Sequence, residues 1–127
     1  MTFASPAARR GANAYAQTAT DAALTASPHQ LIAMLFEGAL NAIALAQYHV
    51  AQADIPAKGL AISKAINIIE NGLKASLDPG AGGPEGARVA ATLTQLYEST
   101  VRLLLYANLH NDADALQRAK QLIEPVA

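Results

Sequence analysis

The sequence predicts an all-α protein, arranged as an antiparallel up-and-down four-helix bundle with a short extra N-terminal helix. Alanine and leucine dominate the chain of 127 residues, and aromatic residues make up only 5% of it. No stretch alternates apolar and polar residues for long enough to form a strand. Long segments with a helical period are instead joined by short connections, a pattern that favours antiparallel neighbours.

The N-terminal part of the chain divides into a tail and a short helix. Residues 1–12 predict a flexible tail, because they are small and polar and lack apolar periodicity. Their Ser, Ala and Arg content also fits a transit peptide, whereas the apolar core of a secretory signal is missing. A short helix is expected over Asn13–Leu24, and residues 13–127 form the single predicted domain.

The first two long helices each have a recognisable start. Ser27 can cap the first, with Pro28 at the first helical position and Gln30 completing a capping box, and the pattern runs to Gln52. Asp54 can cap the second helix, which tolerates a proline in its first turn and is expected to reach Leu77.

Turn residues then separate the last two helices. The segment DPGAGGPEG, Asp78–Gly86, is rich in glycine and proline and predicts a flexible connection. A third long helix is expected over Glu85–Leu109. After the tight turn HND, Asp112 can cap a fourth helix that ends near Pro125.

The apolar faces of these helices are wider than a bundle helix needs. In the first long helix only Glu37, Asn41 and Tyr48 mark a clearly polar line, and in the second Leu60 and Ile68 lie off the main stripe, which includes Ile55 and Ile66. Two interpretations remain open at this point. The surplus residues either belong to helices buried on several sides, or they form an exposed groove for an amphipathic helix of a partner.

Composition and motifs point away from several classes of function. The formal net charge is −1 and the basic residues are scattered, which argues against a nucleic-acid partner. The longest uncharged run is too polar and too short to predict membrane insertion. No cysteine is present, which fits a reducing cytosol. The three histidines have no metal-ligand spacing, His49 is expected to be a buried or half-buried residue on the apolar stripe, and no catalytic motif occurs, so we expect neither an enzyme nor a cofactor.

Several stretches in a fixed order carry a resemblance to a known family. They are NAYAQTATDAALTASPHQLIAMLFEGAL (Asn13–Leu40), ASLD (Ala75–Asp78), LYE (Leu96–Glu98) and YANLHNDADAL (Tyr106–Leu116). Together they resemble the FliS family of flagellin export chaperones. The resemblance implies a cytoplasmic bacterial helical bundle that binds the disordered C-terminal helical segment of flagellin, prevents its premature polymerisation and assists its delivery to the flagellar export gate.

The resemblance also implies which residues meet the partner. Tyr15 and Gln17 fall in the N-terminal motif, which can pack over the groove, whereas Asn108 and Asp112 are expected to act as structural caps. The expected partner-binding residues are Tyr15, Gln17, Leu31, Met34, Leu35, Leu40 and Ile68. A self-associating bundle that hides the same apolar surface in a homodimer is the alternative, and a ligand-binding bundle ranks third.

Overall fold

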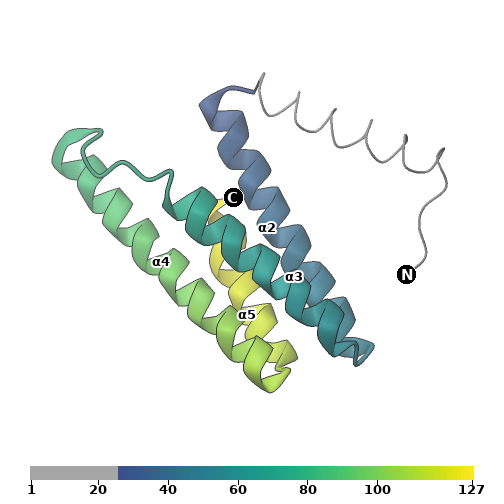
Figure 1. Cartoon of the computed structure of the whole chain (residues 1–127). Helices are drawn as coiled ribbons and strands as arrows, with labels where there is room; N and C mark the ends of the chain where they lie inside the picture. Colours follow the sequence, from purple (N-terminus) through teal and green to yellow (C-terminus); the bar gives the residue numbers. More distant parts are fainter. Residues whose placement is uncertain (1–25) are drawn as a thin grey trace, which may run out of the picture. The chain divides into compact units, whose positions relative to one another are not determined.

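The structure is a computed structural model that describes residues 26–127, and all regular elements in this range are helical (Figure 1). The prediction of an all-α protein is therefore confirmed. The predicted tail (residues 1–12) and the short helix Asn13–Leu24 lie outside the described residues. The elements are α2 (Pro28–Ala51), α3 (Ile55–Ile68), the π-helix η1 (Ile69–Lys74), α4 (Gly83–His110), α5 (Ala113–Ile123) and the 3₁₀-helix η2 (Glu124–Val126).

The helix starts form as predicted. At the start of α2 the Ser27 hydroxyl accepts the Gln30 N–H at 3.1 Å, and the Gln30 side chain accepts the Ser27 N–H at 2.8 Å. This reciprocal pair is a capping box. Asp54 caps α3 by accepting the Ala57 N–H at 3.2 Å, and Asp112 caps α5 by accepting two N–H groups of its first turn.

The second predicted helix is not one regular α-helix up to Leu77. It changes at Ile69 into the π-helix η1, which ends at Lys74. A π turn is one residue wider than an α turn, and here it keeps Ile69 and Leu73 buried together. The backbone at Gly72 lies so close to α2 that an added Cβ would stand 2.9 Å from a Leu35 methyl carbon. The wider π turn and the residue without a side chain, Gly72, therefore occur at the same place in the chain.

The connection from η1 to α4 depends on its glycines. Gly82 and Gly83 have φ values of 77° and 66°, the left-handed region that side chains other than glycine rarely adopt. An added Cβ on Gly86 would overlap the carbonyl oxygen of Ala81. The predicted turn is confirmed up to Gly82, whereas α4 begins at Gly83, two residues before the expected start at Glu85 and inside the predicted connection.

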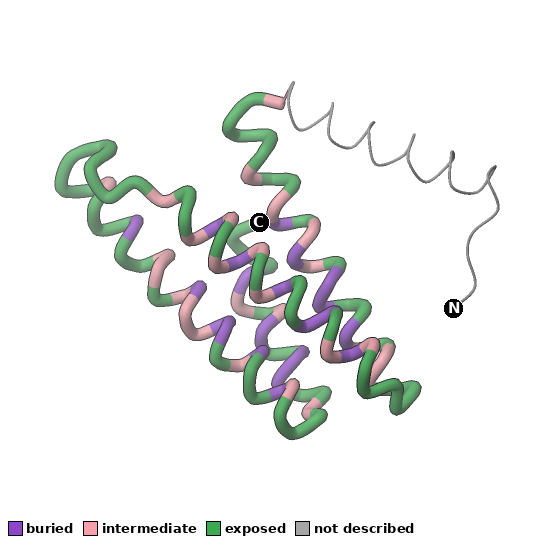
Figure 2. The backbone as a smooth tube through the Cα atoms, in the orientation of Figure 1, coloured by how far each residue is buried: buried purple, intermediate pink, exposed green. Residues whose placement is uncertain are grey.

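The chain divides into two compact units, residues 1–31 and Ile32–Ala127. The second unit contains the hydrophobic core, which receives side chains from α2, α3, η1, α4 and α5, and Figure 2 shows these buried positions. The largest fully buried apolar side chains are Ile43, Ile62, Ile69, Leu73, Leu104, Leu116 and Ile123.

Two stripe positions of the second predicted helix, and Leu96 of the third, differ from the burial that the helical period predicts. Ile55 is 48% exposed because it occupies the first turn of α3, at the end of the unit. Ile66 and Leu96, which the helical period would place in the core, are only partly buried against it. The polar line Glu37, Asn41 and Tyr48 is exposed as predicted.

Specific contacts join the helices of the second unit. Gly38 of α2 faces Ile68, since an added Cβ would lie 3.3 Å from the Ile68 side chain. The rings of Phe36 in α2 and Tyr97 in α4 are 6.3 Å apart. Gln47 of α2 donates a hydrogen bond of 3.0 Å to Gln117 of α5. α2 thus touches each of the other long helices of this unit.

Helix α2 is also the one helix among residues 26–127 that is long and apolar enough to cross a membrane. This property is weak evidence by itself, because signal sequences and the core helices of soluble proteins share it. Its buried residues are Phe36, Ala39, Ala42, Ile43 and Ala46, and 28% of the apolar window is buried.

Candidate functional site

The outer face of α2 carries apolar side chains that the core does not use. Met34 is 40% exposed, Leu45 is 50% exposed and Tyr48 is 58% exposed. At about 100° per residue these three positions fall within one narrow sector of the helix. Leu31, near the start of α2 in the first unit, is 37% exposed. Two predicted partner-binding residues, Leu31 and Met34, therefore have accessible side chains.

The other predicted positions lie elsewhere on the molecule. Leu35, Leu40 and Ile68 are partly buried and pack against the core. Leu35 contacts the backbone of η1 at Gly72, and Ile68 contacts Gly38. Leu40 is rotated about 120° around the helix from Met34. The structure does not gather these positions on one face, and Tyr15 and Gln17 lie outside the described residues.

A second apolar surface results from the unequal lengths of α4 and α5. α4 has 28 residues, about 42 Å of helix, whereas α5 has 11 residues, about 16 Å. Ser99 and Arg118 line the same hollow, as do Tyr106 and Asp114, so α5 lies along the C-terminal half of α4. The N-terminal half of α4 extends beyond the end of α5 (Figure 1).

The side of α4 that faces α5 continues into this free half. Leu96 and Val89 precede Leu103 by two and four helical turns, and Leu103 lines the contact with α5. Val89 is 58% exposed, and Leu93 and Leu96 are partly buried against the core. We call this surface the open seam, and its residues are Val89, Leu93 and Leu96.

Lys58 makes specific contacts that the sequence analysis did not predict. Its side chain is only 3% exposed, and its ammonium donates to the Asn108 carbonyl at 2.8 Å and to the Asn111 side-chain oxygen at 2.6 Å. Asn111 ends α4 in a left-handed conformation with φ of 52°. Lys58 therefore fixes the turn between α4 and α5 to the start of α3. Lys58 lies on the same helical face as Ile62 and Ala65, and this spacing could have indicated that its side chain is buried.

Asn108 and Asp112 were both expected to cap helices in this turn, and only Asp112 does so. Asp112 caps α5, as predicted, by accepting the N–H groups of Asp114 at 2.9 Å and Ala115 at 3.2 Å. Asn108 contributes its backbone carbonyl to Lys58, and Asn111 provides the C-cap of α4.

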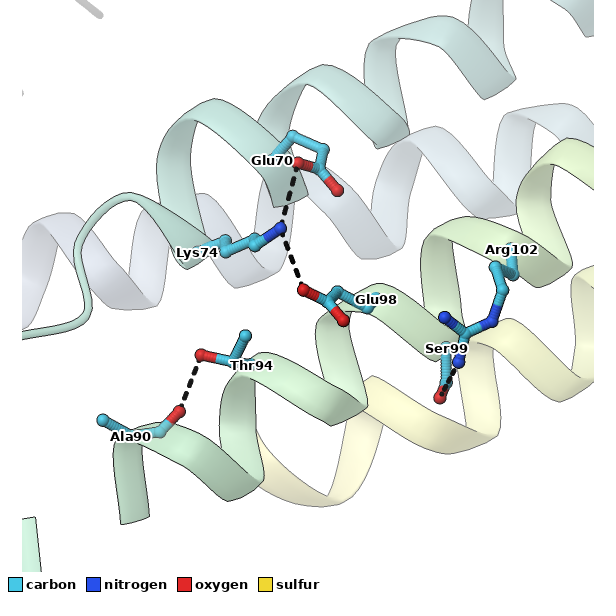
Figure 3. Close-up of polar contacts among 7 residues, drawn as sticks. All are labelled: Glu70, Lys74, Ala90, Thr94, Glu98, Ser99 and Arg102. Carbon is cyan, nitrogen blue, oxygen red and sulfur yellow. Dashed lines mark hydrogen bonds and ion pairs between the residues drawn. The ribbon is translucent and has the colours of Figure 1, made fainter. Parts of the chain in front are cut away.

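Lys74 and two glutamates form a half-buried group of ion pairs on the surface. Lys74 lies 3.2 Å from Glu98 and 3.6 Å from Glu70 (Figure 3), and its hydrogen bond to Glu98 raises the pKa of its ammonium. Within residues 26–127 there is no group of three His, Asp or Glu side chains that could hold a metal ion. His49 is half-buried, as expected, and its ring lies 5.3 Å from that of Tyr48.

A hollow lies between α4 and α5. It measures about 630 Å³ and is lined by Ser99, Arg102, Leu103, Tyr106, Asp112, Asp114, Ala115 and Arg118. Two of its charges neutralise each other, since Arg118 pairs with Asp114 at 3.1 Å. The hollow has neither a buried polar group nor a nucleophile with an adjacent base, and it offers a contact surface rather than a reaction site.

Comparison with known proteins gives a consistent result over most of the chain. The family model described as "Flagellar protein FliS" matches residues 11–127. The chain is 49% identical to the flagellar secretion chaperone FliS of Salmonella typhimurium over 92% of its own length and 84% of that protein. It is 40% identical to the protein of the same name from Escherichia coli, over 94% and 86%, and 37% identical to the flagellar secretion chaperone FliSB of Pseudomonas aeruginosa, over 86% and 83%.

Proposed function

Because the chain belongs to the FliS family, whose members are export chaperones and not enzymes, we propose that it binds the disordered C-terminal helical segment of flagellin. In this proposal the chaperone works in the bacterial cytosol. It keeps flagellin from polymerising early and assists its delivery to the flagellar export apparatus.

The open seam is the observation that carries the proposal. It leaves apolar side chains at the end of α5 without a helix over them, and Val89 is more than half exposed there. An amphipathic helix of a client can cover such a surface with residues spaced three and four apart. Each methylene group that it buries contributes about 0.8 kcal/mol, and part of this energy is lost in ordering the client chain.

The proposed arrangement of the helices is the antiparallel four-helix bundle. The order of the contacts supports it. Lys58 at the start of α3 meets Asn108 near the end of α4, whereas Lys74 at the end of η1 meets Glu98 in the middle of α4. Contacts that run in opposite order along two helices favour antiparallel packing.

The proposed partner-binding residues remain those given by the sequence. Leu31 and Met34 are available as exposed contacts, whereas Leu35, Leu40 and Ile68 are partly buried against the core. Tyr15 and Gln17 belong to the proposal through the family resemblance alone.

The test pairs flagellin binding with thermal stability in matched variants. Val89→Glu places a charge on the open seam, and Gln95→Glu places one on an exposed position of α4 outside it. We expect both variants to melt within about 2 °C of the parent, because exposed substitutions change stability little. Val89→Glu should weaken flagellin binding at least about tenfold, since the charge would be buried in an apolar interface. Gln95→Glu should bind normally.

Calorimetry and sizing complete the test. Burial of the seam predicts a negative heat-capacity change on binding and weak dependence on salt. Normal flagellin binding by Val89→Glu would exclude the seam as the client site. A homodimer that persists in the presence of flagellin, with no mixed complex, would favour the alternative of a self-associating bundle.

A further inference from the structure

The hydroxyl of Tyr97 is the polar end of a side chain that otherwise belongs to the core. Tyr97 is 3% exposed, and its ring lies 6.3 Å from the ring of Phe36 in α2. A hydroxyl that is taken out of water needs a hydrogen-bond partner, because leaving it unpaired costs free energy. The Tyr97 hydroxyl therefore needs a partner at the edge of the core.

This partner does not belong to the described part of the chain. The hydroxyls of Thr94 and Thr100, which lie on either side of Tyr97 along α4, donate to backbone carbonyls four residues earlier in the same helix, both at 2.8 Å. The rigid ring of Tyr97 carries its hydroxyl away from the helix backbone, and this hydroxyl makes no hydrogen bond within residues 26–127. No side-chain oxygen in that range is both fully buried and unpaired. The partner of the Tyr97 hydroxyl therefore comes from outside residues 26–127.

Tyr97 lies beside the open seam. It is next to Leu96 and follows Leu93 by one helical turn, about 40° away around α4. Val89, one turn before Leu93, is 58% exposed. Long side chains on a helix point back toward its N-terminus and cover the preceding turn. The Tyr97 side chain therefore extends toward Leu93 and the half of α4 that α5 leaves free.

We propose that the Tyr97 hydroxyl donates a hydrogen bond to the flagellin helix that binds on the open seam. This inference rests on the proposed function and names a residue that determines specificity at the same site. A helix that covers the seam excludes water from this hydroxyl, so an apolar residue opposite it would leave the O–H group unpaired. The carbonyls inside a helix are already paired. The acceptor is therefore a side chain of the client: the amide oxygen of Asn or Gln, or the hydroxyl of Ser or Thr.

One such acceptor in an otherwise apolar stripe fixes the register of the client helix. Apolar contacts have no direction, so they allow a helix to slip by one turn, about 5.4 Å. The same slip breaks a hydrogen bond. Binding sites that are mostly apolar obtain orientation and specificity from a small number of polar groups in this way.

Tyr97→Phe in the full-length protein tests the inference, because it removes only the hydroxyl. Calorimetry with the C-terminal segment of flagellin should show binding about tenfold weaker than that of the parent, since the acceptor on the client loses its donor. The free variant should melt within about 2 °C of the parent. Tyr106→Phe is the matched control: Tyr106 lies on the same helix and is 51% exposed, so solvent already reaches its hydroxyl and binding should not change.

Nuclear magnetic resonance provides a readout that a purely structural role would not move. With the Cζ carbon of tyrosine labelled, the Tyr97 signal, identified by its absence in Tyr97→Phe, should shift when the flagellin segment binds. Equal flagellin binding by Tyr97→Phe, or an unshifted signal, would overturn the inference and leave the proposed function intact. A lower melting temperature of free Tyr97→Phe would also overturn it, because the hydroxyl would then bond within the chain. Failure of the parent to bind flagellin would refute the proposed function itself, and this inference with it.

Discussion

Replacement of Lys58 by methionine should destabilise the protein by about 2 kcal/mol, because it removes a cation from the C-terminal end of α4. The last carbonyls of a helix have no partner within the helix, and the Asn108 carbonyl is one of them. A partly buried cation at a helix C-terminus contributes up to about 2 kcal/mol, and a hydrogen bond from a charged donor contributes about 1.5–3 kcal/mol.

The cost of burying the charged ammonium opposes these contributions and limits the net loss of stability to about that value. The ammonium loses several kcal/mol of hydration when it is buried at 3% exposure, and methionine removes this cost while keeping most of the packing of the lysine stem. What remains is the penalty for two acceptors, the Asn108 carbonyl and the Asn111 side-chain oxygen, that lose their donor. For a chain of this size the loss corresponds to a melting temperature about 8 °C lower.

Chemical denaturation and a double-mutant cycle with Asn111→Gly provide the assay. Glycine tolerates the left-handed φ of 52° at this position, so the single variant removes the acceptor without straining the turn. Because Lys58 and Asn111 interact directly at 2.6 Å, the cycle should give a coupling energy of about 1 kcal/mol. A Lys58→Met variant as stable as the parent, or a coupling energy of zero, would refute the argument that this lysine holds the turn.

Three further predictions concern the core and the glycine turn. Phe36→Ala should cost about 3–4 kcal/mol in a denaturation experiment, since Phe36 is 6% exposed and contacts Tyr97, and a loss below 1 kcal/mol would mean that the site collapses without a cavity. Gly86→Ala should lower the melting temperature by more than Gly80→Ala, because only at Gly86 would the added methyl group overlap the Ala81 carbonyl; equal shifts would contradict the steric reason. Burial raises the pKa of the Tyr97 hydroxyl above its ordinary value of 10.0, so the unfolded chain loses this proton first and stability should fall as the pH rises above about 10. Urea unfolding from pH 8 to 11 should show a shallower fall in Tyr97→Phe, and identical slopes would exclude a contribution from this hydroxyl.

The starts of the helices could be predicted because each depends on residues only a few positions apart. The reciprocal pair of Ser27 and Gln30, and the caps by Asp54 and Asp112, join groups separated by two or three residues. The same holds for the turn at Asp78–Gly86, where local backbone strain selects glycine. Local interactions of this kind are written into short stretches of sequence.

The candidate binding surface could be predicted only as a surplus of apolar residues. The helical period does not show which of two neighbouring apolar residues is covered, so exposed Met34 and partly buried Leu40 were equivalent on the sequence. Their difference depends on which sides of α2 the other helices occupy. The open seam in turn depends on where α5 ends along α4, which is a relation between two helices.

The sequence by itself determined the helical class, the helix starts, the glycine turn and the membership of the chain in its family. The tertiary structure alone decided that Lys58 is buried, since its acceptors lie 50 and 53 residues away in the chain. It alone decided the π-helix at Ile69–Lys74, where the backbone at Gly72 packs directly on Leu35. The physical reason is the same in both cases: the energy of these features comes from contacts between distant segments, and such contacts exist only once the helices have packed.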